Sequence, residues 1–210
     1  MTLKALLAVL ILSSPISAFA STCGPKPFQV DVRLAAPRET LDMSLDSAAL
    51  AKMGNMSMIG VTQGLTQVEY EISLSTEYEA TSTPDSRWCS RARKVTATFG
   101  FKSPPKIFLA NGLARGSCLY NAVLRHEYQH LAIAKETLTE GKAWIGKAVN
   151  DILALGGSTG PTAQLASDTL ERSLMNHVEM VTKRLYYRAE VRNLSLDTPE
   201  NYRRLGASCP

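Results

Sequence analysis

The spacing of apolar residues changes at Ser117, and this change constrains the fold more than any other feature of the sequence. Before Ser117, apolar and polar residues alternate as they do in half-buried strands, over residues 28–34, 68–75 and 95–101. After Ser117, apolar residues recur at helical spacing, which predicts one helix to Leu155 and a second over residues 163–192. Strands followed by helices predict an α+β fold, with a small, mainly antiparallel sheet and two long C-terminal helices.

Local signals mark the ends of these elements. Ser117 is a favourable N-cap for the first helix, and the glycine-rich stretch 156–161 ends it. We expect a kink in this helix at Gly141 or Gly146. Pro104 and Pro105 end the preceding strand, and residues 106–110 are predicted to form a short strand after them. We expect this short strand to be a sheet edge that binds an extended peptide by strand addition.

The first twenty residues have the three-part pattern of a secretory signal peptide. Lys4 supplies the basic start, residues 5–12 are apolar, and Ala18–Phe19–Ala20 is a cleavage signal. The apolar run is shorter than the ~20 residues that a membrane-spanning helix needs. We therefore expect cleavage after Ala20 and an exported, periplasmic or secreted mature chain without a transmembrane segment. Residues 21–210 are expected to form a single domain.

Composition excludes several functional classes. The chain of 210 residues is 45% hydrophobic and 20% charged, which is typical of a globular domain and not of a disordered chain. Its net charge of +4 is too small to indicate a nucleic-acid partner, and no glycine-rich nucleotide-binding motif is present.

An even number of cysteines in an exported chain suggests disulfide bonds. Of the three pairings, we favour Cys89 with Cys118 and Cys23 with Cys209.

The first predicted helix contains His126-Glu127-Tyr128-Gln129-His130, an H-E-x-x-H sequence. Residues four apart on a helix leave the same face, so both imidazoles can bind one Zn²⁺. Glu127 lies about 100° around the helix axis from His126, close enough to reach a metal-bound water without binding the metal. The pattern therefore predicts Glu127 as the general base of a zinc hydrolase. The alternative is a pair of solvent-exposed histidines on an amphipathic helix.

A third zinc ligand has to come from elsewhere in the chain. His177 is the remaining histidine and lies beside the apolar stripe of the second helix; Glu171 and Glu190 are the carboxylate alternatives. A straight hairpin turning near residue 159 would place residues 188–192 level with the motif and favour Glu190. A kink at Gly141 would bring His177 or Glu171 into reach instead. We take His177 as the leading candidate and keep both carboxylates as alternatives.

The motif and its uncharged neighbours, residues 123–132, resemble the zincin superfamily of metalloproteases. More loosely, the chain resembles a group of exported bacterial zincin-like proteins of uncertain function, through Trp88–Cys89, Pro104–Pro105, Cys118 and Tyr120. This resemblance implies a zincin-like domain, His126 and His130 as zinc ligands, Glu127 as the general base, and a peptide or protein substrate. The residues after His130 lack the Gly-x-x-His of the metzincins.

Taken together, these features predict an exported zinc metallopeptidase. One alternative is an amidase that acts on cell-wall peptide with the same zinc site. Another is a non-catalytic periplasmic module that binds partners or assists assembly and keeps zinc for structure. Glu127 favours the catalytic alternatives, because a structural zinc site needs no general base.

Overall fold

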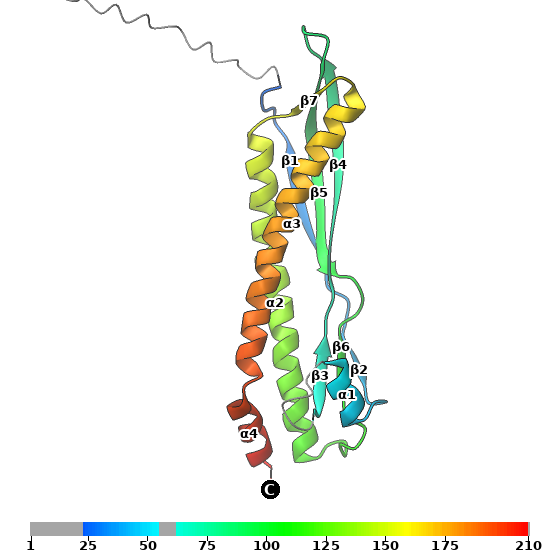
Figure 1. Cartoon of the computed structure of the whole chain (residues 1–210), viewed down its shortest axis with the longest axis vertical. Coiled ribbons are helices and arrows are strands. Elements are labelled where there is room, and N and C mark those ends of the chain that lie inside the picture. Colours follow the sequence, from blue (N-terminus) through cyan, green and yellow to red (C-terminus); the bar gives the residue numbers. More distant parts are fainter. Residues whose placement is uncertain (1–22, 55–61, 210) are drawn as a thin grey trace, which may run out of the picture.

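The computed structural model describes residues 23–54 and 62–209; the predicted signal peptide, residues 1–20, lies outside this range. Strands come first and the long helices follow, so the predicted α+β class is confirmed (Figure 1). The elements are β1 (Gln29–Ala35), β2 (Thr40–Asp42), α1 (Ser47–Met53), β3 (Gly64–Gln67), β4 (Tyr70–Ser82), β5 (Trp88–Phe101), β6 (Lys106–Leu109), α2 (Cys118–Ala154), β7 (Ser158–Gly160), α3 (Ala163–Leu196) and α4 (Pro199–Ala207).

The described strands form two small sheets in which antiparallel pairs outnumber parallel ones, as predicted, but the prediction of a single sheet is wrong. The larger sheet has the order β1-β5-β4, with β7 paired to β5, and the smaller has the order β2-β6-β3. In both sheets the first pair of strands is parallel and the second is antiparallel. Pro104 and Pro105 separate β5 from β6, because proline has no N–H to donate to a strand ladder. Strands β1, β5 and β4 of the larger sheet are joined by short connections to β2, β6 and β3 of the smaller sheet, and the strand order is the same in both sheets.

The short strand β6 lies in the middle of the smaller sheet, between β2 and β3. Both of its edges are paired with neighbours, so the prediction that residues 106–110 form an open edge is wrong. Among the described strands, β3 pairs with β6 alone and is an edge of this sheet. The sequence pattern showed where β6 lies along the chain but not which strands would flank it.

Helices α2 and α3 run side by side along one face of the larger sheet (Figure 1). The side chain of Ser117 caps α2 as predicted, accepting a hydrogen bond from the backbone N–H of Tyr120 at 3.1 Å. The helix continues through Gly141 and Gly146 without an interruption. A Cβ on Gly141 would lie 2.3 Å from Cε1 of Phe99, so this glycine allows α2 to approach β5 closely.

Both predicted disulfide pairings are wrong. The structure pairs Cys23 with Cys89 and Cys118 with Cys209. β1 pairs in parallel with β5 from Gln29 opposite Lys94, so the chain before β1 runs along the first residues of β5, which places Cys23 beside Cys89. Cys118 begins α2 and meets the chain just after α4.

Two disulfides are compatible with an oxidising, exported location. None of the helices in the described ranges combines the length and apolar character needed to span a bilayer.

Candidate metal centre

The H-E-x-x-H residues lie on the first half of α2, and its two histidines face the same space as expected from their spacing. The Nε2 atoms of His126 and His130 are 3.2 Å apart, and the two rings meet edge to face. Both side chains are buried, with 6% and 12% of their surfaces exposed. Two imidazole nitrogens are therefore held close together in a partly dehydrated site.

Asp197, the C-cap residue of α3, completes the cluster. Its Oδ1 atom is 3.1 Å from Nε2 of His126 and 3.1 Å from Nε2 of His130. Each of the three atoms thus lies within 3.2 Å of the other two. This group of two imidazoles and one carboxylate could hold a metal ion.

Asn193, one helical turn before Asp197, determines which nitrogen of His130 is free. The side-chain oxygen of Asn193 lies 2.9 Å from Nδ1 of His130, so Nδ1 is the hydrogen-bond donor. In the neutral imidazole, Nε2 then carries the lone pair, and that lone pair faces Asp197 and His126. This arrangement suits metal binding, since ligand histidines usually donate their other N–H to a protein oxygen.

Tyr202 of α4 supports the carboxylate. Its hydroxyl donates a hydrogen bond of 2.7 Å to Oδ1 of Asp197. Burial by itself raises the pKa of Asp197, but the hydrogen bonds that His126 and His130 donate when they are protonated, together with the one from Tyr202, outweigh burial and hold its pKa far below the usual range. Burial and the bond to the carboxylate raise the pKa of Tyr202, which keeps the hydroxyl protonated as a donor. Asp197 is thus an ionised carboxylate that is fixed in place.

Glu127 lies beside this cluster but is not part of it. Its side chain is 4% exposed, and Oε2 accepts a hydrogen bond of 2.8 Å from the hydroxyl of Thr66 on β3. Burial raises the pKa of Glu127, although Thr66 and the two histidines act in the opposite direction. A raised pKa brings a carboxylate closer to the value that suits a general base near neutral pH.

The structure gathers His126, Glu127 and His130 in one place, but not the three candidates for the third ligand. Asp197 is the third member of the metal-binding group identified among the described residues. Glu171 of α3 lies near Tyr78 on β4. Glu190, also on α3, is exposed and lines the same cavity as Asn193. His177 is half-buried between them along α3.

The position of Asp197 follows from the way α3 crosses α2 (Figure 1). Helix α3 extends a full turn beyond the predicted end at Arg192. The contacts with the histidines come from Asn193, on this added turn, and from Asp197, directly after it, and not from residues 188–192. A usable signal was present in the sequence. Asn193 and Asp197 are four residues apart, which is the same spacing as His126 and His130, and Asp197 immediately precedes Thr198–Pro199.

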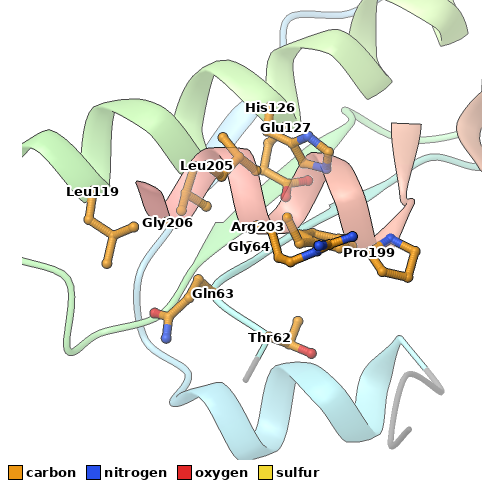
Figure 2. Close-up of a pocket in the computed structure, with 12 residues that line it drawn as sticks. Thr62, Gln63, Gly64, Leu119, His126, Glu127, Pro199, Arg203, Leu205 and Gly206 are labelled. Atoms are coloured by element: carbon orange, nitrogen blue, oxygen red, sulfur yellow. The ribbon is translucent and has the colours of Figure 1, made fainter. Parts of the chain in front are cut away.

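Two cavities of about 460 Å³ and 330 Å³ meet at this site. Gly64, Glu127 and Tyr202 line both of them, and β3 borders both. Figure 2 shows the larger cavity, which is bounded by α2, α4 and the residues that lead into β3. The smaller cavity extends along α3 past His130 and Asp197. Glu127 therefore lies between the two cavities, next to β3.

No family model matches the chain, and comparison with curated proteins and with solved structures gives no significant match.

Proposed function

We propose that the protein is an exported zinc-dependent metallopeptidase with a zincin-like domain, in which Glu127 is the general base. One observation carries this proposal: three potential ligand atoms from His126, His130 and Asp197 converge within 3.2 Å of one another, beside a buried glutamate. The likeness of residues 123–132 to the zincins supports it. The predicted signal peptide and the two disulfides support export.

The chemistry and spacing of the donors fit zinc. Zinc binds imidazole nitrogen and carboxylate oxygen at ~2.0–2.1 Å in tetrahedral geometry, which separates neighbouring ligand atoms by ~3.4 Å. The measured separations of 3.1–3.2 Å are close to this value. Three protein ligands leave a fourth position open, as in catalytic zinc sites, whereas structural sites are closed by four. His126, His130 and Asp197 are therefore proposed as the ligands, and Asp197 takes the place considered for His177, Glu171 or Glu190.

Bound zinc would supply a water molecule with a pKa near 7 and would polarise the carbonyl group of the substrate. Glu127 would accept a proton at its carboxylate and later deliver that proton to the leaving amine. Thr66 holds one carboxylate oxygen, Oε2, so the orientation of Glu127 is fixed before substrate binds. Tyr202 and Asn193 hold Asp197 and His130, which limits the movement of two of the three ligands.

The free edge of β3 supports a peptide as the substrate. An extended peptide can add to such an edge through backbone hydrogen bonds, and the two cavities would then receive its side chains. Glu127 lies between the cavities, next to Gly64 of β3. A peptide bond opposite Gly64 would therefore be placed close to the general base.

Replacement of Glu127 by Gln tests the proposal, because the amide keeps the shape of the side chain but cannot accept the proton. We expect Glu127→Gln to retain zinc and to lower hydrolysis of a quenched fluorescent peptide set by ~10²–10⁴-fold. Glu171→Gln, far from the site, should retain both zinc and activity. Full activity in Glu127→Gln would contradict the proposed role. A zinc-loaded protein that cleaves none of the peptides would favour the non-catalytic module, and cleavage confined to cell-wall stem peptides would favour the amidase.

A further inference from the structure

The two cavities on either side of Glu127 are both lined mostly by apolar groups, but they hold different polar residues. The smaller cavity contains polar groups from His130, Asn193, Glu190 and Asp197. The larger is lined mainly by apolar residues and glycine, including Leu119, Val123, Pro199, Leu205 and Gly206. The larger cavity, beneath α4, is therefore the more apolar of the two.

We propose that the larger cavity receives a bulky apolar side chain of the substrate next to the bond to be cleaved, and that α4 is the segment that sets this preference. The inference rests on the proposed function for the position of the cleaved bond. It assigns the substrate class, peptides with a large aliphatic or aromatic residue, from the walls of the cavity alone.

The size of the cavity suits such a side chain. Its volume is about 460 Å³, whereas a cavity of ~150 Å³ is enough for a benzene molecule. Figure 2 shows three segments around the space, with Leu119 from α2, Leu205 from α4 and Gln63 from the residues before β3. An aromatic or long aliphatic side chain would contact both leucines at once.

The charges around the cavity disfavour ionised side chains. Besides His126 and Glu127, the one charged residue of the lining is Arg203. Its guanidinium is largely exposed and forms an ion pair with Glu200 at 2.7 Å, so it is directed toward solvent and already has a partner. An ionised side chain would lose water on entering the cavity, whereas an apolar side chain gains by leaving water, so the lining favours the apolar side chain.

Helix α4 supplies much of the wall, yet it is weakly held by packing. It contributes Pro199, Tyr202, Arg203, Leu205 and Gly206 to the lining, and none of its residues is fully buried. An isolated helix of this length is unstable in water. Bonds at both ends attach it: at its start Tyr202 donates to Asp197 and Asn201 donates to the carbonyls of Ser195 and Leu196, and the disulfide follows its last turn. The disulfide between Cys118 and Cys209 therefore maintains the apolar wall.

Peptide binding to zinc-loaded Glu127→Gln protein tests this assignment without requiring cleavage. The probes are two fluorescein-labelled alanine peptides that are identical except for one central residue, Phe or Asp, and the readout is fluorescence anisotropy. We expect the Phe peptide to bind about ten- to hundred-fold more tightly. Leu205→Trp, which fills the cavity, should reduce this preference to less than about three-fold. Leu165→Trp, a matched change on an exposed part of α3, should leave the preference unchanged.

A second variant tests the role of α4 itself. Replacement of both Cys118 and Cys209 by serine should lower the Phe preference as strongly as Leu205→Trp, while the far-ultraviolet circular dichroism spectrum keeps the signal of α2 and α3. Equal binding of the two peptides to the parent, or a Phe preference that survives Leu205→Trp, would overturn the inference. Hydrolysis plays no part in this readout. A Leu205-dependent Phe preference in a protein that cleaves nothing would therefore refute the proposed function and leave the inference intact.

Discussion

A Cβ atom on Gly64 would lie 2.5 Å from Oε1 of Glu127 and 2.7 Å from Cγ1 of Val123. Any side chain at position 64 would therefore occupy the space of the proposed general base. The close approach of β3 to α2 explains how Glu127 is both dehydrated and oriented: glycine supplies the space, and Thr66, two residues later on the same face of the strand, supplies the hydrogen bond.

Gly64→Ala should displace Glu127 and lower peptide hydrolysis by at least ten-fold, because a shift of about 1 Å in a catalytic group can cost 10²-fold. Overpacking of this kind should also lower the free energy of unfolding by about 1–3 kcal/mol. Steady-state kinetics and urea denaturation measure the two effects. Gly112→Ala is the control, since its added Cβ would meet no atom within 4 Å. Equal activity in the two variants would mean that Glu127 needs no fixed position.

Asp197→Ala should abolish stoichiometric zinc binding, because it removes one of three proposed ligands. The loss of affinity should exceed the ten- to hundred-fold that is typical when a supporting residue is removed. His177→Ala and Glu171→Gln should keep the zinc content of the wild type, since neither side chain belongs to the metal-binding group. Elemental analysis after dialysis gives the result. Retention of zinc by Asp197→Ala, with loss in His177→Ala, would return the third position to His177.

Tyr202→Phe removes the hydroxyl that donates to Oδ1 of Asp197 and leaves the ring in place. We expect zinc affinity to fall about ten- to hundred-fold, with little change in the unfolding transition of the metal-free protein. Competition with a chromophoric chelator measures the affinity. Tyr128→Phe is a matched control, because Tyr128 lies between the two histidines in sequence but is 45% exposed. The same affinity in both variants would show that Tyr202 does not support the carboxylate.

Two glycines of α2 provide a test of its packing. Gly141→Ala should lower the free energy of unfolding by about 1–3 kcal/mol, because the added Cβ would lie 2.3 Å from Phe99 in the core. Gly146→Ala should raise it by about 0.5–1 kcal/mol, because alanine is the better helix former and its Cβ would make an ordinary contact of 3.5 Å with Val32. Chemical denaturation of the two variants should therefore give opposite signs; stabilisation by both would contradict the close approach of α2 to β5.

The two disulfides should differ in their resistance to reduction. Cys23 and Cys89 are 2% and 0% exposed, whereas Cys118 is exposed to solvent. Mild treatment of the folded protein with a dithiol should therefore release Cys118 and Cys209 first. Alkylation followed by peptide mass spectrometry identifies the thiols and also tests the pairing itself. Early labelling of Cys23 and Cys89 would contradict the burial of that bond.

Features encoded locally could be predicted from the sequence. The boundaries of α2 follow from the Ser117 cap and the glycines after Leu155, and the break between β5 and β6 follows from Pro104 and Pro105. The spacing of His126 and His130 placed both rings on one face of a single helix. Each of these conclusions depends on residues within a few turns of one another.

Features that depend on the relative placement of distant segments were not predictable in the same way. Cys23 pairs with Cys89 because β1 adds to β5 in parallel, and the strand pattern contains no information on that partnership. The third member of the metal-binding group depends on where α3 crosses α2 and on how far α3 continues. The predicted end of α3 at Arg192 fell about one helical turn short, and Asp197 was not among the candidates His177, Glu171 and Glu190.

The metal-binding residues are separated by a long stretch of chain. His130 and Asp197 are 67 residues apart, and they meet only after α2 and α3 have formed and packed together. An unfolded chain offers a metal ion the pair His126 and His130 without the carboxylate, and full affinity requires the finished tertiary structure. The proposed site would therefore acquire its ion late in the life of each molecule. The compartment in which the chain folds, and not the one in which it is synthesised, would determine which metal it carries.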